Sequence, residues 1–328
     1  MKLTKQVECI VNRYLKRGNE FSRGIIDIRA FKAIDFLSET LARQGQPFSI
    51  LDLGCSGGPT NAWIRNWDKY NWVGIDAEAR AIEKLDSILP KKSGLMLGYI
   101  YSSKFCNHEI PTDESQIEIE SLFELNFFDF VKIDIDGCDL HILEGILSSA
   151  RSESILGIEI EVTYSTYRNS EINFARCATL LIEKGFEPMA IESARRYPSK
   201  LFSSPYVWDI DAQTAMGRVF QGNQTWVKSN VADATRAKVA TSLILAAYGL
   251  SDWAWECLGS FLEGNGREYQ GISEANLRNY FLPSFLDMDS SDEYENSLDS
   301  NYLYSDHFKF WRAQAQDREL EQPWFLSN

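Results

Sequence analysis

The sequence predicts an α/β protein that has a doubly wound, mostly parallel sheet and a mainly helical C-terminal extension. Short apolar segments alternate with amphipathic helical segments from residue 47 to about residue 215, which is the pattern of successive β-α-β units. Beyond residue 215 the alternation stops and helical spacing dominates. We therefore expect an N-terminal helical segment at 1–46, a sheet domain at 47–215 and a helical extension at 216–328.

The expected strands are short and apolar, whereas the expected helices repeat apolar residues at every third or fourth position. The strands lie at 48–53, 72–76, 95–101, 128–133, 155–162 and 187–191. The helices lie at 27–43, 60–68, 80–89, 140–149 and 175–184, and in the extension at 236–249, 252–262 and 306–319. The first two helices of the extension are expected to form a helical hairpin. An acidic, serine-containing run near 287–300 is typical of a solvated linker.

The composition is that of an acidic globular protein of 328 residues, with 44% apolar residues and a formal net charge of −14. This charge argues against binding nucleic acid chiefly through phosphates, which requires clustered Lys and Arg. The six cysteines are scattered and form no metal-ligand spacing with the three histidines, as is typical of reduced cytoplasmic thiols. The N-terminus has no signal-peptide core, and no apolar run approaches the roughly 18 residues of a spanning helix. We expect a cytoplasmic protein without a membrane span.

The first strand ends on a carboxylate, Asp52, and is followed at once by a turn of small residues that reaches Gly58. The next strand ends on a second carboxylate, Asp76. Because parallel strands end at the same edge of a sheet, the turn and Asp76 are expected to meet there. That geometry suits a nucleoside-bearing cofactor, with the turn beneath its charged middle and the acid on its ribose hydroxyls. Ser56 and Pro59 occupy two glycine positions of the G-x-G-x-x-G fingerprint, which disfavours a nicotinamide-dependent dehydrogenase.

A second group of acids follows the strand at 128–133. Strand alternation places Asp134 and Asp136 on one face at the carboxyl end of this strand, and Glu159 and Glu161 likewise on a neighbouring strand. Ligands of open α/β sheets bind at that edge. Lys132 shares the face of Asp134 but lies further from the edge, so we interpret it as a structural ion-pair partner.

Two motifs carry a family resemblance. The pattern D-x-G-x-S-x-G at 52–58 is similar to motif I of class I S-adenosylmethionine-dependent methyltransferases. The segment 129–145 resembles the D-x-x-K-[IV]-D-[VI]-E-G-x-E-x-x-[VIL]-L-x-G segment of FkbM-type methyltransferases, and the likeness extends over roughly residues 45–210. This chain has Ser56 where that family usually has Asn, and it has Asp136 and Asp139 in place of two glutamates.

The resemblance implies an S-adenosylmethionine-dependent O-methyltransferase. Its acceptor would be a hydroxyl of a sugar, in a surface polysaccharide or glycan precursor, or of a secondary metabolite. Asp76 would hold the cofactor ribose, and the turn would pass beneath the methionine portion. We expect cofactor contacts from Asp52, Gly54, Cys55, Ser56, Gly58, Asp76 and Ala77.

A hydroxyl acceptor must lose its proton as the new bond forms, and a carboxylate or an imidazole can take it. The candidate catalytic residues are Asp134, Asp136, His141 and Glu161. His141 could equally be a structural residue of the following helix, and Asp139 is expected to cap that helix or to lie in its first turn. As an alternative, Asp134, Asp136 and Glu159 are candidates to hold Mg²⁺, which would lower the pKa of the acceptor hydroxyl.

A function of a different class is also compatible with the sequence. The departures at Ser56, Asp136 and Asp139 could mark a catalytically inactive binding or scaffold protein on the same fold, with the extension as its interaction module. In either case the extension could cap the site, form a homodimer or recruit a partner enzyme. The sequence leaves these alternatives open.

Overall fold

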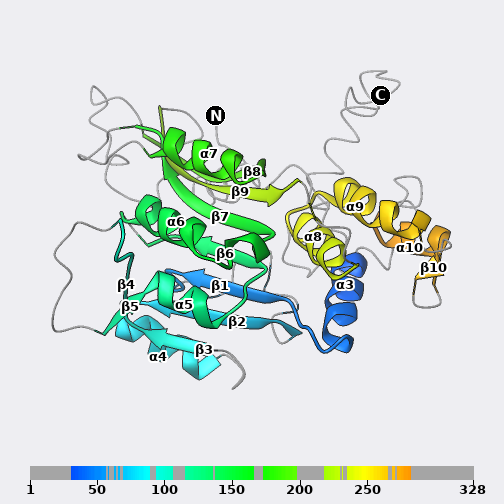
Figure 1. Ribbon diagram of the computed structural model, residues 1–328, viewed down its shortest axis with the longest axis horizontal. Coiled ribbons are helices and arrows are strands. Elements are labelled where there is room, and N and C mark those ends of the chain that lie inside the picture. Colours follow the sequence, from blue (N-terminus) through cyan, green and yellow to red (C-terminus); the bar gives the residue numbers. More distant parts are fainter. Residues whose placement is uncertain are drawn as a thin grey trace, which may run out of the picture.

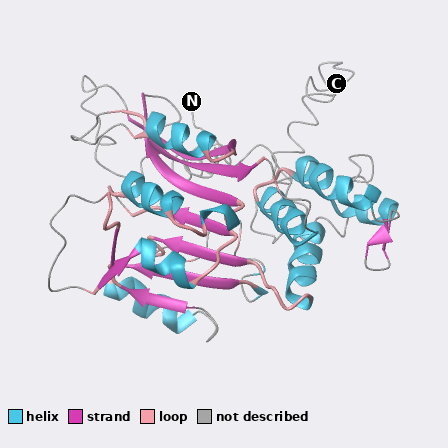
Figure 2. Ribbon diagram, in the orientation of Figure 1, coloured by secondary structure: helices cyan, strands magenta, loops and turns pink. Residues whose placement is uncertain are grey.

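The computed structural model describes residues 31–56, 58, 63, 66, 69–88, 94–105, 115–135, 137–165, 173–197, 218–229, 231, 235–264, 268–269 and 272–281. These residues form a seven-stranded sheet with helices packed against it, and a group of helices at one side of the sheet (Figure 1). Figure 2 shows the same arrangement by secondary structure. The acidic run near 287–300 and the helix expected at 306–319 lie outside the described residues, as does most of the helix expected at 60–68.

The strand order of the main sheet is β3-β2-β1-β6-β7-β9-β8. In chain order its strands are β1 (Ser49–Leu53), β2 (Asn71–Asp76), β3 (Gly94–Leu97), β6 (Phe130–Ile133), β7 (Gly157–Thr163), β8 (Phe186–Tyr197) and β9 (Arg218–Lys228). Only β9 runs antiparallel to its neighbours. The sheet thus places its third, second, first, fourth, fifth, seventh and sixth strands side by side, which is the arrangement of the class I methyltransferase fold. The expected fold class is confirmed.

Among the described helices, six agree closely with the sequence expectation, and two others, at 119–125 and 274–281, lie where we expected none. They are α3 (Phe31–Arg43), α4 (Ala79–Ile88), α5 (Ile119–Leu125), α6 (Asp139–Ser148), α7 (Phe174–Glu183), α8 (Thr235–Ala247), α9 (Ser251–Gly264) and α10 (Glu274–Phe281), with a short 3-10 turn at Ser152–Ser154. The expected helical hairpin is confirmed, because α8 and α9 pack on each other across a turn at Gly249. Two small sheets complete the described elements, β4 (Tyr99–Tyr101) with β5 (Gln116–Glu118), and β10 (Glu268–Tyr269) with β11 (Ile272–Ser273).

One expected strand is divided. We expected a single strand at 95–101, but β3 ends at Leu97 and β4 leaves the main sheet to pair with β5. Gly98 lies at the division, where the chain crosses β5 closely. A Cβ atom there would lie 2.7 Å from Ile117 Cδ1, so a larger residue would have to displace the Ile117 side chain.

A second expectation is wrong at the end of the sheet domain. We placed residues 216–228 in the helical extension, but 218–228 form β9, which lies inside the sheet between β7 and β8. The strand carries several polar residues, including Gln221 and Asn223, which obscure its apolar alternation. Their side chains bind glutamates of β7. The sheet therefore continues to Lys228, one strand beyond the expected boundary.

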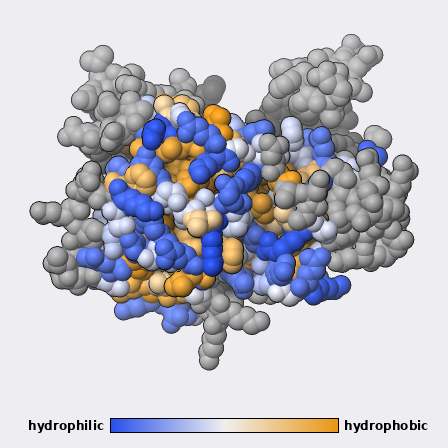
Figure 3. Space-filling model, in the orientation of Figure 1, coloured by the Kyte–Doolittle hydropathy of each residue, from blue (hydrophilic) through white to orange (hydrophobic). Residues whose placement is uncertain are grey.

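The two faces of the sheet have different compositions. The apolar face contributes Leu51, Leu53, Val131, Ile133, Ile158 and Ile160, which pack under α5, α6 and α7. The mixed face carries Ile50, Phe130 and Gly157 near the amino ends of the strands and Asp52, Lys132 and Glu159 near the carboxyl ends. On the outer surface of the molecule over α5, α6 and α7, apolar residues form separate groups among polar ones (Figure 3).

The N-terminal helix and the extension share one hydrophobic core with the mixed face. Leu37 of α3 and Leu243 of α8 are fully buried in this core together with Ile50 and Phe130. Arg236, at the start of α8, donates two hydrogen bonds to Asp129, at 2.6 and 2.7 Å. The described part of the extension is therefore packed onto the sheet. Among the described residues, no helix has the length and apolar character needed to cross a bilayer.

Candidate active site

The turn after β1 lies at the carboxyl edge of the sheet, directly against the end of β6. Gly54 has a positive φ of 79°, a conformation that favours glycine. A Cβ atom on Gly54 would lie 1.7 Å from the carbonyl oxygen of Asp134. The turn is thus in direct contact with the backbone of Asp134, the first acid after β6, at the edge where the sequence placed both.

Asp76 is bound to the same turn. Its carboxylate accepts hydrogen bonds from the backbone N–H of Ser56, at 2.9 Å, and of Glu78, at 2.8 Å. The backbone N–H of Gly54 donates to Ile75 at 2.9 Å, and that of Gly58 donates to Cys55 at 2.7 Å. A carboxylate offers about four lone-pair sites, so Asp76 retains capacity for two further donors, such as the hydroxyls of a ribose.

The other expected cofactor contacts differ in what they can offer. Ala77 and Ser56 are exposed beside Asp76, and Gly58 is half-buried against Leu85. The Cys55 side chain is fully buried in the hydrophobic core, and burial raises the pKa of its thiol to about 12. Cys55 can therefore contribute only backbone atoms to a ligand in the turn.

Lys132 joins the turn to the acids of the mixed face. Its Nζ lies 3.2 Å from Asp134 Oδ2 and 3.4 Å from Asp52 Oδ1, and it donates to the Gly54 carbonyl at 3.4 Å. Burial opposes its charged form, but Asp52, Asp134 and Glu159 outweigh that effect and raise the pKa of Lys132. The expectation that Lys132 is a structural ion-pair partner is confirmed.

Asp52 and Asp134 occupy unlike positions on either side of this lysine. The Asp52 side chain is 3% exposed and lies beneath the turn, whereas that of Asp134 is 30% exposed at the edge. Burial raises the pKa of Asp52 to about 6, and the charge of Lys132 opposes this rise. Asp134 is therefore the acid of this pair that an acceptor can reach.

Glu159 and Glu161 follow Lys132 across the mixed face, and both are buried. Glu159 lies opposite Lys132 in the strand register. It accepts a hydrogen bond from Asn223 Nδ2 at 3.0 Å and another from the Tyr248 hydroxyl. Glu161 accepts one from Gln221 Nε2. The sequence placed both glutamates correctly on one face.

Their amide and phenol partners are the residues that sequence reasoning missed. Gln221 and Asn223 belong to β9 and Tyr248 follows α8, so all three lie in the segment expected to form an extension. The signal that could have identified this strand was its content of aromatic and β-branched residues, which favour strands. These residues include Phe220, Trp226 and Val227.

The loop between β6 and α6 is held by Asp139. Its carboxylate accepts hydrogen bonds from the N–H of Ile135, at 3.0 Å, and of Gly137, at 3.1 Å. Asp139 is buried, and it lies in the first turn of α6 as expected. Burial raises its pKa, and the backbone hydrogen bonds offset part of that rise. Asp139 therefore fixes the loop that follows Asp134, while Asp136 lies outside the described residues.

The structure places His141 next to Glu144 on α6. Its Nδ1 lies 3.6 Å from Glu144 Oε2, and Glu144 also accepts a hydrogen bond from Arg176 Nη2 of α7 at 3.2 Å. This group sits where α6 and α7 meet. His141 therefore has a structural partner on its own helix. Asp134, rather than His141, lies against the Gly54 turn.

The magnesium alternative finds no support in the described part of the chain. Within it, no three His, Cys, Asp or Glu residues are arranged to hold a metal ion. Both carboxylate oxygens of Glu159, one of the candidate ligands, already accept hydrogen bonds.

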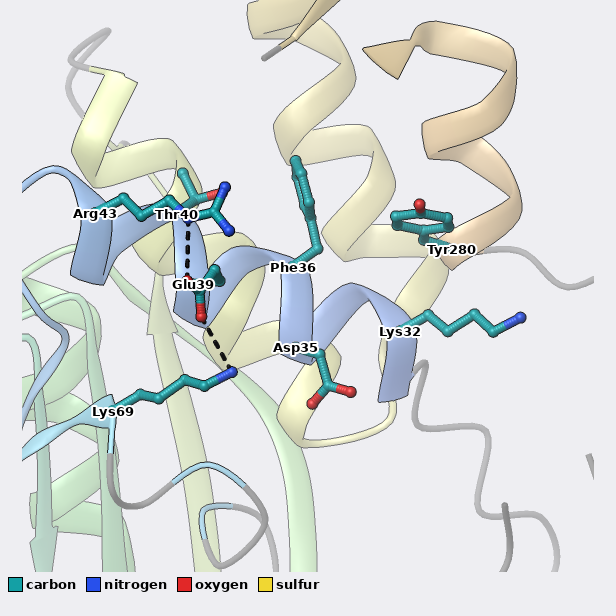
Figure 4. Close-up of a pocket in the computed structure, with 8 residues that line it drawn as sticks. All are labelled: Lys32, Asp35, Phe36, Glu39, Thr40, Arg43, Lys69 and Tyr280. Atoms are coloured by element: carbon teal, nitrogen blue, oxygen red, sulfur yellow. Dashed lines mark hydrogen bonds and ion pairs between the residues drawn. The ribbon is translucent and has the colours of Figure 1, made fainter. Parts of the chain in front are cut away.

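A hollow of about 690 Å³ lies elsewhere, on the outer side of α3 (Figure 4). It is lined by Lys32, Asp35, Phe36, Glu39, Thr40, Arg43, Lys69 and Tyr280. Glu39 pairs with Arg43 at 3.0 Å and with Lys69 at 3.3 Å. Lys69 precedes β2 while Asp76 ends it, so this hollow lies at the opposite edge from the candidate site.

No family model and no curated protein matches the sequence. Among solved structures, the chain is similar to a TehB-like SAM-dependent methyltransferase from Corynebacterium glutamicum, with 13% identity, a TM-score of 0.30, and coverage of 69% of this chain and 100% of that chain.

Two further matches have similar values. A 1,6-didemethyltoxoflavin-N1-methyltransferase from Burkholderia thailandensis has 15% identity and a TM-score of 0.32, covering 70% of this chain and 92% of that one. A magnesium protoporphyrin IX methyltransferase from Synechocystis has 13% identity and a TM-score of 0.32, covering 70% and 99%. TM-scores this low support no inference about activity, so the fold assignment rests on the strand order of the sheet.

Proposed function

We propose that this protein is an S-adenosylmethionine-dependent O-methyltransferase of FkbM type. Its acceptor in this proposal is a hydroxyl of a sugar in a surface polysaccharide or glycan precursor, or of a secondary metabolite. The observation that carries the proposal is the meeting of Asp76 and Asp134 around the Gly54 turn. This meeting lies at the carboxyl edge between β1 and its two neighbours, where open α/β sheets bind their ligands.

The charges around the candidate site fit this cofactor. S-adenosylmethionine bears a positive sulfonium and an ammonium group, and it supplies an electrophilic methyl group when bound. Around the candidate site, Asp52, Asp134 and Glu159 face one buried cation, Lys132, so the acids outnumber it. Asp76 would hold the ribose hydroxyls, and the turn from Gly54 to Gly58 would lie beneath the methionine portion. Such a site favours a cationic ligand over an anionic one.

Asp134 is the best placed residue to take the proton of the acceptor hydroxyl. Its Oδ2 lies 3.2 Å from Lys132 Nζ, an ion pair that orients the carboxylate, and its side chain is 30% exposed to an acceptor. Orientation of this kind is the main demand of a direct methyl transfer, because the reacting atoms must be aligned. Glu161 is a less accessible candidate since it is buried and bound by Gln221; Asp136 and His141 remain further candidates.

Calorimetric titration with S-adenosylhomocysteine tests the proposal directly. We expect binding by the wild type and about 10- to 100-fold weaker binding by Asp76→Ala, because that variant loses a charged acceptor of hydrogen bonds from the ligand. Asp86→Ala is the matched control, since Asp86 is an exposed acid on α4. Absence of wild-type binding at millimolar ligand would overturn the proposal. A screen of hydroxyl acceptors with labelled S-adenosylmethionine would then identify the substrate.

One observation favours the second candidate, a catalytically inactive binding or scaffold protein. The backbone N–H of Ser56 donates to the carboxylate of Asp76, so atoms of the chain itself hold the turn, as a binding or scaffold protein would also require. Asp134→Asn separates the two functions. An enzyme should lose methyl transfer and still bind S-adenosylhomocysteine, whereas a scaffold protein has no methyl transfer to lose.

A further inference from the structure

Glu159 is a buried acid that connects the candidate site to the helical extension. It lies in β7, 4% exposed, opposite Lys132 in the register. Its two oxygens are bound from two other elements, one by Asn223 of β9 and one by Tyr248, which follows α8. A buried carboxylate is stable only when it is paired and hydrogen-bonded. The hydrogen bonds from these two donors therefore determine whether Glu159 needs a further partner.

Without these two hydrogen bonds, Glu159 would compete with Asp134 and Asp52 for the ammonium group of Lys132. The lysine contacts Asp134 at 3.2 Å and Asp52 at 3.4 Å, and Glu159 is close enough to raise its pKa. If Glu159 lost a donor, its best remaining partner would be the Lys132 ammonium group. Lys132 would then be drawn toward β7 and away from Asp134, which would lose its orientation.

Tyr248 is well placed to prevent this. Its ring lies 5.8 Å from the ring of Phe130 and 5.8 Å from that of Trp63, measured between centroids. Both neighbours are buried in the core that joins α8 to the mixed face. Packed aromatic rings have little freedom to turn, so the hydroxyl is held at a fixed position against Glu159.

We propose that Tyr248 is a positioning residue of the candidate active site, which holds Glu159 so that Lys132 stays bound to Asp134. The extension thereby supplies part of the site. Tyr248 donates a hydrogen bond to Glu159, Glu159 acts on Lys132 through its charge from the neighbouring strand, and Lys132 forms an ion pair with Asp134. Asn223 supports the same arrangement from β9. This inference rests on the proposed function for its consequence in catalysis, but the contacts themselves can be tested without any ligand.

The direct test is the ¹⁵N resonance of the Lys132 ammonium group, assigned through its loss in Lys132→Arg. Tyr248→Phe keeps the aromatic ring and removes only the hydroxyl, and we expect it to shift this resonance. Tyr164→Phe is the matched control, because it removes a phenol hydroxyl that is bound by Gln224 at 2.8 Å. The control should leave the Lys132 resonance unchanged.

A double-mutant cycle separates positioning from packing. In a Glu159→Gln background Tyr248→Phe should cause no further shift, because the carboxylate that competes for Lys132 is absent. A shift of equal size in both backgrounds, or none in a folded Tyr248→Phe protein, would overturn the inference. Should Tyr248→Phe not fold, Asn223→Leu removes the other donor and is expected to shift the resonance as well; an unchanged resonance there would contradict the inference.

Methyl transfer gives the second readout. With an acceptor found by screening, Tyr248→Phe should lower turnover on the order of tenfold, while the Kd for S-adenosylhomocysteine stays within about twofold. Loss of wild-type cofactor binding would refute the proposed function and leave the resonance test decisive for Tyr248. An unchanged turnover together with a shifted resonance would show that Tyr248 positions Lys132 without serving catalysis, and would overturn the catalytic part of the inference.

Discussion

The two faces of the sheet are buried by different means. The apolar face is covered by α5, α6 and α7 through aliphatic side chains along the whole length of the strands. The mixed face is apolar only at the amino ends, where Ile50 and Phe130 meet α3 and α8. At the carboxyl ends it buries Asp52, Lys132 and Glu159, where Lys132 pairs with Asp52 and Glu159 accepts a hydrogen bond from Asn223. The comparison teaches that this sheet separates packing from charge, since the described charges that a ligand could use lie on the mixed face, where they depend on pairing.

Removing the single cation of the charged cluster should break this separation most severely. Lys132→Met leaves three carboxylates without their shared partner, and we expect it to destabilise the protein by about 3–5 kcal/mol. On the apolar face, Ile133→Val removes one methyl group next to this position and should cost only about 1 kcal/mol. Urea unfolding at neutral pH measures both. Equal losses for the two variants would contradict the expectation that the buried acids of the mixed face depend on Lys132.

A glycine pair tests how tightly the turn and the acids are joined. Gly54→Ala places a Cβ atom 1.7 Å from the Asp134 carbonyl in addition to the positive φ, so we expect a loss of about 3 kcal/mol. Gly45→Ala is the matched control, because Gly45 has a similar φ of 70° and no atom within 4 Å of the added Cβ. It should lose about 1 kcal/mol. Thermal and urea unfolding compare the two, and similar losses would argue against the close contact at Asp134.

The smallest expected effect concerns pH. Burial, opposed by Lys132, raises the pKa of Asp52 from 3.8 to about 6. For an acid with a raised pKa, the contribution to stability is complete below the unfolded value and is lost as the pH rises through the folded value. Between pH 4 and pH 7 the wild type should therefore lose about 2 kcal/mol more than Asp52→Asn. Urea unfolding across this range measures the difference, and parallel curves for the two proteins would contradict it.

Much of the fold could be predicted from local pattern. The helices near α3, α6, α7, α8 and α9 follow from apolar residues at helical spacing, and β1, β2, β6 and β7 from short apolar runs. Strand β9 could not be recognised in this way, because Gln221, Asn223 and Gln224 interrupt its apolar pattern. Their side chains donate hydrogen bonds to the glutamates of β7 and to the tyrosine that follows this strand, so their polarity is satisfied only in the folded sheet.

The candidate site shows the same division. The sequence by itself determined that Asp52, Asp76 and Asp134 share one edge with the Gly54 turn, because the carboxyl ends of parallel strands always meet at the same edge. Only the tertiary structure decided that Asp52 is buried under Lys132 while Asp134 stays accessible. It also brought Asn223 and Tyr248, which lie 64 and 89 residues along the chain from Glu159, to the same carboxylate. Local periodicity specifies where a strand ends and which face a residue takes, but contacts over such separations depend on how distant elements pack.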